Sequence, residues 1–185
     1  MIGTILLIAL GLIALWVILI FNRLVRDRNQ VRSAWSDIDV QLTRRHDLVP
    51  RLVEAVKAYG AYEKATLTAV TELRSRSEQA NRLRDKARYE DEMEAGLHRL
   101  IALAEDYPDL KADTNFLELQ RELVAVEDHL QYARRFYNGA VRIYNTRIET
   151  FPDMFVARPF GFTGAEFFEP EGAEARVPPR VRMSP

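Results

Sequence analysis

The N-terminal part of the chain is one apolar stretch. Residues 1–21 carry no charged side chain, and only Gly3, Thr4 and Gly11 fall outside the hydrophobic class. A helix of this length spans roughly 32 Å, against about 30 Å for the hydrocarbon core of a bilayer. The stretch lacks the basic start, short apolar core and small-residue exit of a cleaved signal peptide. The pattern therefore predicts a retained transmembrane signal anchor over residues 1–21, rather than a buried core helix.

Positive charge follows this stretch. Arg23, Arg26, Arg28 and Arg32 come directly after it, with Asp27 among them. Basic residues next to a transmembrane helix stay on the cytoplasmic side. We therefore expect a single-pass protein of the cell (inner) membrane, in contact with the lipid bilayer, whose C-terminal domain faces the cytoplasm.

After the anchor, apolar positions recur at alternating steps of four and three, the a/d pattern of a packed helix. The members are Val31, Trp35, Ile38, Leu42, Arg45, Val49, Leu52, Val56 and Tyr59. Pro50 falls inside the pattern and predicts a kink or an interruption of the helix. Asp47, just before it, is a candidate cap for a restarted helix.

Residues 74–94 are strongly polar, which predicts a solvated helix face and a turn between helices. The alternative is a docking site for an acidic partner or for anionic lipid headgroups, against which the adjacent acidic residues count. A third helix is predicted from Met93 to about Asp106, and the last helix ends at Phe151–Pro152. Asp113, Thr114 and Asn115 are the candidate N-caps of that last helix, and Asn115 with Glu118 resembles a capping box. Its a/d positions are Phe116, Leu119, Leu123, Val126, Leu130, Ala133, Tyr137, Ala140 and Tyr144.

These patterns predict an all-α fold, in which an N-terminal transmembrane helix is followed by an antiparallel helical bundle. The bundle has about four helices, of which the first and the last are long. We expect it to occupy residues 22–151. An aromatic-rich strap packing on the bundle is expected at residues 152–168, and a flexible tail rich in Pro, Glu and Arg at residues 169–185.

The soluble part resembles the LemA family of bacterial membrane proteins. The resemblance rests on RNQV at 28–31, AWSDIDVQL at 34–42, RRHDLVPRLV at 44–53 and EDYPDLKA at 105–112, and on Asn115, Phe116, Leu119, Gln120, Glu122, Leu123, Glu127, Ala133, Arg134, Tyr137, Asn138, Tyr144, Asn145, Phe151 and Pro152. In order and spacing these positions cover about residues 22–168. The resemblance implies a single-pass membrane protein with a helical-bundle domain, and it implies no established enzymatic activity.

The composition of the chain argues against several classes of function. The chain has 26 Lys+Arg against 27 Asp+Glu, no Cys and three His. A net charge of −1 removes the electrostatic drive for nucleic-acid binding. Glu-x-x-His pairs, P-loops and Gly-x-Ser-x-Gly motifs are absent from the sequence. We therefore expect no catalytic site, no metal site and no cofactor.

Arg45 is the one charged member of the first a/d pattern. A charge at such a position lowers stability and can set the register of a bundle through a buried partner. Glu127 and Glu122, on the last helix, are the candidate partners. The alternative is that the Arg45 side chain extends from the seam to water.

Two further features are candidates for structural or interaction roles. Tyr137-Asn138 and Tyr144-Asn145 repeat with a period of seven, so both pairs share one helix face, either for bundle packing or as a polar groove for a partner. Six of the nine phenylalanines lie between residues 151 and 168, among them Phe160 and Phe162. This segment either straps onto the bundle or is exposed, to dock on a partner or enter the bilayer interface.

These observations favour a membrane-anchored interaction scaffold or adaptor with protein partners of unknown identity. The alternative is a regulatory or sensory module whose bundle shifts on binding, and an enzyme with an unfamiliar site comes third. The sequence leaves a homo-oligomer open, although Gly3 and Gly11 do not form a Gly-x-x-x-Gly dimer motif.

Overall fold

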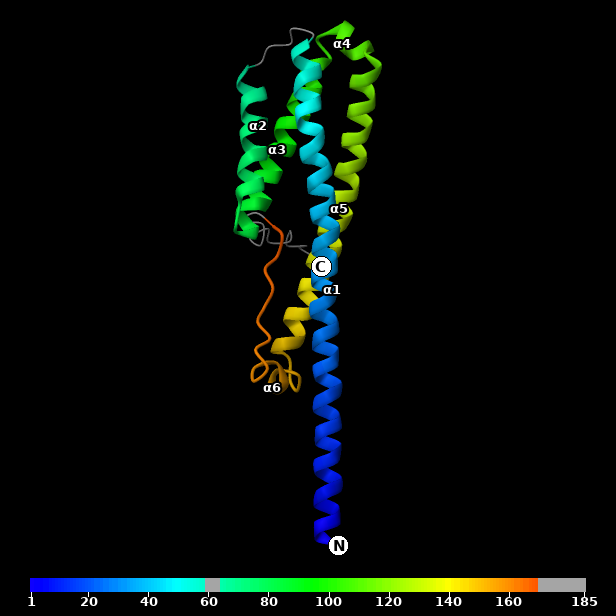
Figure 1. Cartoon of the computed structure of the whole chain (residues 1–185), viewed down its shortest axis with the longest axis vertical. Helices are drawn as coiled ribbons and strands as arrows, with labels where there is room; N and C mark the ends of the chain where they lie inside the picture. Colours follow the sequence, from blue (N-terminus) through cyan, green and yellow to red (C-terminus); the bar gives the residue numbers. More distant parts are fainter. Residues whose placement is uncertain (59–63, 170–185) are drawn as a thin grey trace, which may run out of the picture. The chain divides into compact units, whose positions relative to one another are not determined.

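The computed structural model describes residues 1–58 and 64–169. Within these residues it contains helices and no strands, so the all-α prediction is confirmed. The helices are α1 (Ile2–Ala58), α2 (Lys64–Gln79), α3 (Leu83–Ala104), α4 (Pro108–Ala112), α5 (Thr114–Glu149) and α6 (Met154–Ala157) (Figure 1). Tyr59 of the first a/d pattern, and residues 170–185 of the expected flexible tail, lie outside the described residues.

The chain divides into two compact units. Unit 1 comprises residues 1–43 and 126–167, and the described residues of unit 2 are 44–58, 64–125, 168 and 169. The helices α1 and α5 contribute residues to both. The boundaries predicted at residues 21, 151 and 168 stay predictions.

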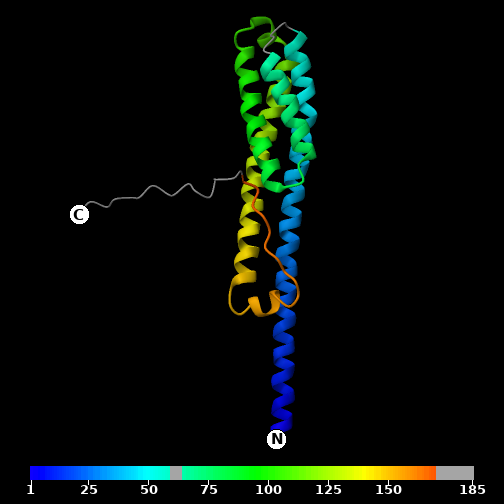
Figure 2. The same ribbon diagram turned by 90° about the vertical axis from the view of Figure 1, so that its left-hand side faces the viewer.

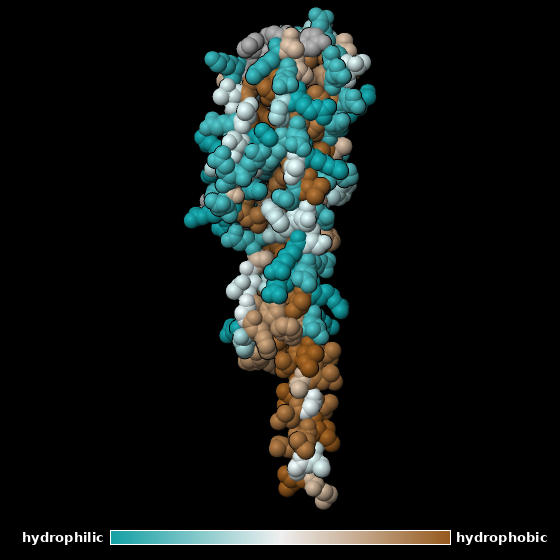
Figure 3. All heavy atoms as spheres, in the orientation of Figure 1, coloured by the Kyte–Doolittle hydropathy of each residue, from teal (hydrophilic) through white to brown (hydrophobic). Residues whose placement is uncertain are grey.

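The first part of α1 is long and apolar enough to cross a membrane. In its most apolar window of 18 residues only 6% are buried, which sets it apart from the core helix of a soluble protein. Figure 3 shows this part of the chain as a brown, hydrophobic surface. The helix is therefore compatible with membrane anchoring, by length and composition.

Pro50 does not end α1. The helix runs through it to Ala58, and Asp47 lies inside the helix and caps no restart. The predicted interruption and restart are therefore wrong. Proline removes one backbone hydrogen bond, but Val49 and Leu52 on either side are buried in the core of unit 2. Packing of the apolar face thus holds the helix together across the missing bond.

Unit 2 is built from the end of α1, from α2, α3 and α4, and from the start of α5. In Figures 1 and 2, α2 and α3 lie side by side as an antiparallel pair. Helix α3 begins at Leu83, ten residues before the predicted start at Met93. The reason is that its buried seam extends further back. The buried positions of α3 are Ala87, Glu90, Met93, Gly96, Leu97, Leu100 and Ala104.

The N-terminus of α5 is capped by Asp113. Its Oδ1 accepts a hydrogen bond from the backbone N–H of Phe116 at 2.8 Å, which satisfies one of the free donors of the first turn. Of the three predicted caps, Asp113 is therefore the one in use. Asn115 and Glu118 lie inside the helix, so the predicted capping box is wrong.

Gly96 allows α2 and α3 to approach closely. A Cβ added at this position lies 2.7 Å from Cγ2 of Val70, a buried β-branched side chain with little freedom to move. We expect Gly96→Ala to lower the free energy of unfolding, since overpacking costs about 1–3 kcal/mol and the gain in helix propensity is at most about 1 kcal/mol.

Urea unfolding of the full-length chain in detergent micelles measures this change. Gly139→Ala is the matched control. Its added Cβ meets no atom within 4 Å, so this variant is expected to gain about 0.5–1 kcal/mol. If both variants gain stability, the close approach at Gly96 is contradicted.

Unit 1 pairs the first part of α1 with the second half of α5. Leu24, Ile38 and Leu130 are among its buried apolar residues. After α5 the chain turns through α6, and an extended segment then returns along the same two helices (orange in Figures 1 and 2). This segment supplies Phe162, which is buried.

Candidate functional site

A buried ionic network lies at the centre of unit 2. The side chains of Arg45 and Glu90 are both 0% exposed. Arg45 Nη1 donates to Glu90 Oε2 at 3.0 Å and to the backbone carbonyl of Glu90 at 3.2 Å. Arg45 Nη2 lies 3.7 Å from Oε2 of the part-exposed Glu94. This arrangement joins the end of α1 to the middle of α3.

Two more side chains complete the network. His46 Nε2 lies 2.7 Å from Glu90 Oε1, and Ser77 Oγ of α2 donates to the same oxygen. His46 Nδ1 lies 3.6 Å from Oε1 of Glu78. Three helices of unit 2 thus converge on a single carboxylate.

The pKa of Glu90 lies below its usual range. Burial by itself raises this pKa, but the hydrogen bond with His46, the charge of Arg45 and the hydrogen bond from Ser77 together outweigh burial. Glu90 therefore stays ionised although it is buried. Ser77 and His46 both bond the same carboxylate oxygen, so the histidine does not stand between serine and acid as the base of a hydrolase triad does. The network is built to hold helices together.

The sequence located Arg45 as the anomaly but did not identify Glu90 as a partner of it. The alternative in which Arg45 reaches water is wrong, because the side chain is wholly buried. Glu122 forms an exposed pair with Arg51 at 3.5 Å rather than a buried one with Arg45. The pairing of Arg45 with Glu127 stays a prediction. Glu90 was assigned to a solvated face, although its spacing to Met93 and Leu97 continues the α3 seam and could have identified it.

The Tyr-Asn repeat of α5 binds the returning segment of unit 1. Asn145 donates from Nδ2 to the carbonyl of Ala165 at 2.9 Å and accepts from the N–H of Ala165 at 2.8 Å. Tyr144 donates to the carbonyl of Thr163 at 2.9 Å, and Tyr137 donates to the carbonyl of Glu166 at 2.8 Å. These side chains contact main-chain atoms, so they hold an extended peptide irrespective of its side chains.

Burial raises the pKa of both tyrosines, which keeps their hydroxyl groups protonated and able to donate hydrogen bonds. It raises the pKa of Tyr137, and the charge of Glu166 adds to this effect. Burial also raises the pKa of Tyr144, and Arg28 and Arg32 partly oppose it. Both phenols therefore keep their protons at physiological pH. Asn138, the fourth member of the repeat, is buried on the same helix.

Five of the six phenylalanines after α5 form two groups, and the sixth, Phe167, is half-buried. Phe162 and Phe168 are buried, and the Phe162 ring packs edge-to-face on Phe21 at 5.6 Å. Phe151, Phe155 and Phe160 are exposed. The two alternatives predicted for this segment, packing on the bundle and exposure, therefore each hold for some of its rings.

The sequence matches a known protein family and several known proteins. The LemA family model matches residues 34–183, which is most of the chain. The chain belongs to the LemA family. It is 28% identical to Protein LemA of Metamycoplasma hominis over 151 residues, covering 80% of this chain and 68% of the relative. It is 32% identical to Magnetosome protein MamQ 2 of Paramagnetospirillum magneticum over 87 residues, covering 46% of this chain and 32% of that protein.

This LemA-family chain carries a second, exposed stripe on α5, which we call the outer stripe. Its members are Tyr132, Phe136, Gly139 and Ile143, at steps of four, three and four. The three large side chains are 66%, 53% and 57% exposed. Arg135 and Arg142 flank the stripe on one side, and Arg135 stacks on the Tyr132 ring at 4.7 Å. The a/d pattern of α5 accounts for its buried face, so the sequence pattern did not identify the exposed stripe beside it.

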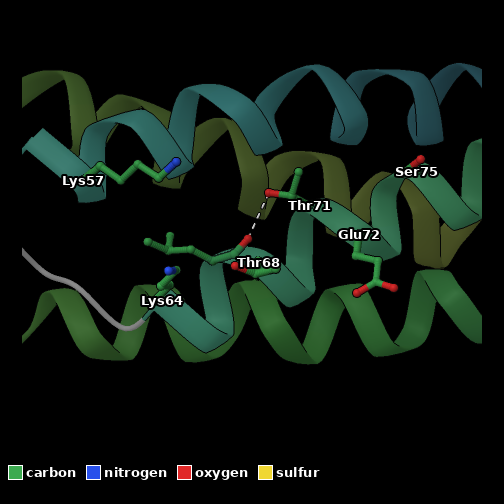
Figure 4. A pocket seen from close by; sticks show the side chains of 7 residues that line it. Lys57, Lys64, Thr68, Thr71, Glu72 and Ser75 are labelled. Carbon is green, nitrogen blue, oxygen red and sulfur yellow. Dashed lines mark hydrogen bonds between the residues drawn. The ribbon is translucent and has the colours of Figure 1, made fainter.

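An open hollow of about 800 Å³ lies beside α2 in unit 2 (Figure 4). Its lining consists of Lys57, Lys64, Leu67, Thr68, Thr71, Glu72 and Ser75. Thr71 Oγ1 donates to the carbonyl of Leu67 at 2.9 Å, and Glu72 pairs with Arg76. These polar groups are used within α2, so the hollow presents surface side chains rather than a built ligand site.

Proposed function

We propose that this LemA-family protein is a membrane-anchored scaffold that docks a partner protein through helix packing on the outer stripe. The apolar part of α1 supports the anchor, and the arginines that follow it support a cytoplasmic C-terminal domain. The role is one of interaction rather than catalysis. What supports it is the outer stripe, which has the spacing of a helix-packing seam.

Gly139 is the observation that carries the proposal. A glycine inside a helix costs about 0.5–1 kcal/mol relative to alanine. At Gly96 a close neighbour accounts for this cost, but a Cβ added at Gly139 meets no atom within 4 Å. A small residue between Phe136 and Ile143 leaves room for a side chain of a second helix to enter, as a knob enters a hole in helix packing.

The flanking charge favours a particular kind of partner. Arg135 and Arg142 lie on the same edge of the outer stripe and both are exposed. In an antiparallel pair of two copies centred on Gly139, these arginines would face one another and repel. An amphipathic helix with an acidic edge from a different protein matches the stripe better.

The test is co-purification of the tagged full-length protein from its native membrane, with stoichiometry. We expect a protein partner in a fixed ratio, and we expect Gly139→Leu to reduce its retention by about tenfold or more, which corresponds to about 1.4 kcal/mol. This variant replaces a helix glycine by a better helix former, and a Cβ at the position meets no atom within 4 Å. Its far-ultraviolet circular dichroism and urea midpoint are compared with those of the wild type to show that it is folded.

Phe136→Asp and Arg44→Asp complete the design. Phe136→Asp is expected to lose the partner as well, whereas Arg44→Asp, exposed on α1 rather than on α5, is expected to retain it. If the partner remains on both Gly139→Leu and Phe136→Asp, or if the protein purifies only with itself, the scaffold proposal is contradicted.

A further inference from the structure

Unit 1 begins to bury α1 where the apolar run ends. Leu19 is 60% exposed, whereas Ile20 is 6% and Leu24 is 0% exposed. The apolar run itself ends at Phe21, and Asn22 and Arg23 follow it. This change from apolar to polar residues marks the edge of the hydrocarbon region for a helix that crosses a bilayer. We call the part of unit 1 around Phe21 and α6 its base. This base therefore lies at that edge.

The segment after α6 contacts α1 at this level. The Phe160 ring packs edge-to-face on Phe21 with centroids 5.1 Å apart, and Phe162 lies 5.6 Å from the same ring. In Figures 1 and 2, α6 lies at the end of unit 1 that is nearest to the apolar part of α1. Figure 3 shows the hydrophobic surface continuing from the apolar part of α1 onto this base.

Three aromatic rings at this base are exposed. Phe151, Phe155 and Phe160 are 72%, 62% and 58% exposed, and Phe151 packs edge-to-face on Phe155 at 5.9 Å. Burying a phenylalanine side chain stabilises by about 1.5–3 kcal/mol. The fold obtains this gain for Phe162 in the same segment but leaves these three rings uncovered.

We propose that Phe151, Phe155 and Phe160 enter the boundary between headgroups and acyl chains of the same bilayer that α1 crosses. The inference rests on the membrane anchor of the proposed function and is independent of any protein partner. The exposed Arg158 lies between Phe155 and Phe160 in the sequence and supplies a cation for anionic headgroups. Contact of Phe160 with Phe21 makes this patch continuous with the anchor, which favours lipid over a soluble protein as its occupant.

The experiment is a depth measurement on the full-length protein in vesicles of phosphatidylcholine and phosphatidylglycerol. Because the chain has no Cys, a single introduced cysteine carries a nitroxide label at one defined position. We expect labels in Phe155→Cys and Phe160→Cys to collide readily with oxygen and to be shielded from a water-soluble nickel complex. Their depth is expected to be about 5–10 Å into the headgroup and acyl boundary.

Two reference positions make the result interpretable. Phe136→Cys, an equally exposed phenylalanine of unit 1 on α5, is expected to collide with the nickel complex. Leu10→Cys, in the middle of the apolar stretch, is expected to lie deep in the hydrocarbon. Should Leu10→Cys be accessible to nickel, the anchor fails. Should Leu10→Cys be deep while Phe155→Cys and Phe160→Cys behave like Phe136→Cys, only this inference fails.

A third result also overturns it. Labels at Phe155 and Phe160 that are shielded from both oxygen and nickel would show that protein, such as a second copy of this chain, covers the patch. The vesicles contain no partner protein, so none of these outcomes depends on the outer stripe.

Discussion

Replacing Glu90 by alanine is expected to lower the free energy of unfolding by about 3–5 kcal/mol, because it removes a buried counter-charge that lies 3.0 Å from the buried Arg45 guanidinium. The same change removes the acceptor of His46 and of Ser77. Urea unfolding of the full-length chain in detergent micelles, followed by far-ultraviolet circular dichroism, measures the loss.

Glu94→Ala is the matched control. Glu94 also faces Arg45, but at 3.7 Å and with 29% of its side chain exposed, so its removal is expected to cost about 1 kcal/mol or less. Equal effects of the two substitutions would contradict the buried network. A double-mutant cycle on Arg45 and Glu127 tests the second partner that the sequence leaves open.

The network also predicts how stability depends on pH. The pKa of Glu90 in the folded state lies below the unfolded value near 4.5. The stabilisation from its ionised form is therefore complete above about pH 4.5 and is lost as the pH falls through the folded pKa. The stability difference between the wild type and Glu90→Gln is expected to shrink on acidification below that point. A difference that stays constant would contradict the lowered pKa.

Replacing Phe162 by alanine is expected to cost about 3 kcal/mol, at the lower end of the range for a buried phenylalanine. The ring is 8% exposed, and it packs on Phe21 with the Arg28 guanidinium 5.0 Å above it. The returning segment loses the buried one of its two aromatic contacts with Phe21, and the contact of the exposed Phe160 ring remains. Fluorescence of Trp35, whose ring packs on Tyr137 in unit 1, reports the loss in a Trp16→Phe background.

Phe160→Ala serves as the comparison. Phe160 touches the same Phe21 ring but is mostly exposed, so its loss is expected to cost about 1 kcal/mol or less in detergent micelles. Similar costs at the two positions would show that burial does not distinguish them.

Much of the fold could be predicted because periodicity and length act locally. Val31, Ile38 and Leu42 of the first a/d pattern are buried, and so are Leu123, Leu130 and Tyr144 of the last. An apolar face has to be covered whatever covers it, so its spacing identifies a helix without knowledge of its partner. The end of α5 followed in the same way from Phe151–Pro152.

The candidate sites were less predictable, because each depends on which surfaces meet. Arg45 required a buried partner, yet sequence spacing cannot say which helix supplies it. Glu90 could not be distinguished in the sequence from the neighbouring charged residues, most of which are exposed or half-buried. The Tyr-Asn repeat was recognised as one face, but its ligand, the backbone of residues 163–166, became evident only when the chain had turned back.

Local pattern thus determined the apolar N-terminal stretch, the helical class and the location of the anomalous arginine, since transfer of side chains out of water depends on their own chemistry and spacing. Continuity of α1 through Pro50, the partner of Arg45 and the division of the phenylalanines into buried and exposed rings were decided by tertiary packing. In each of these cases the outcome depends on a neighbour that is distant in sequence, and its position is defined only once the helices have come together.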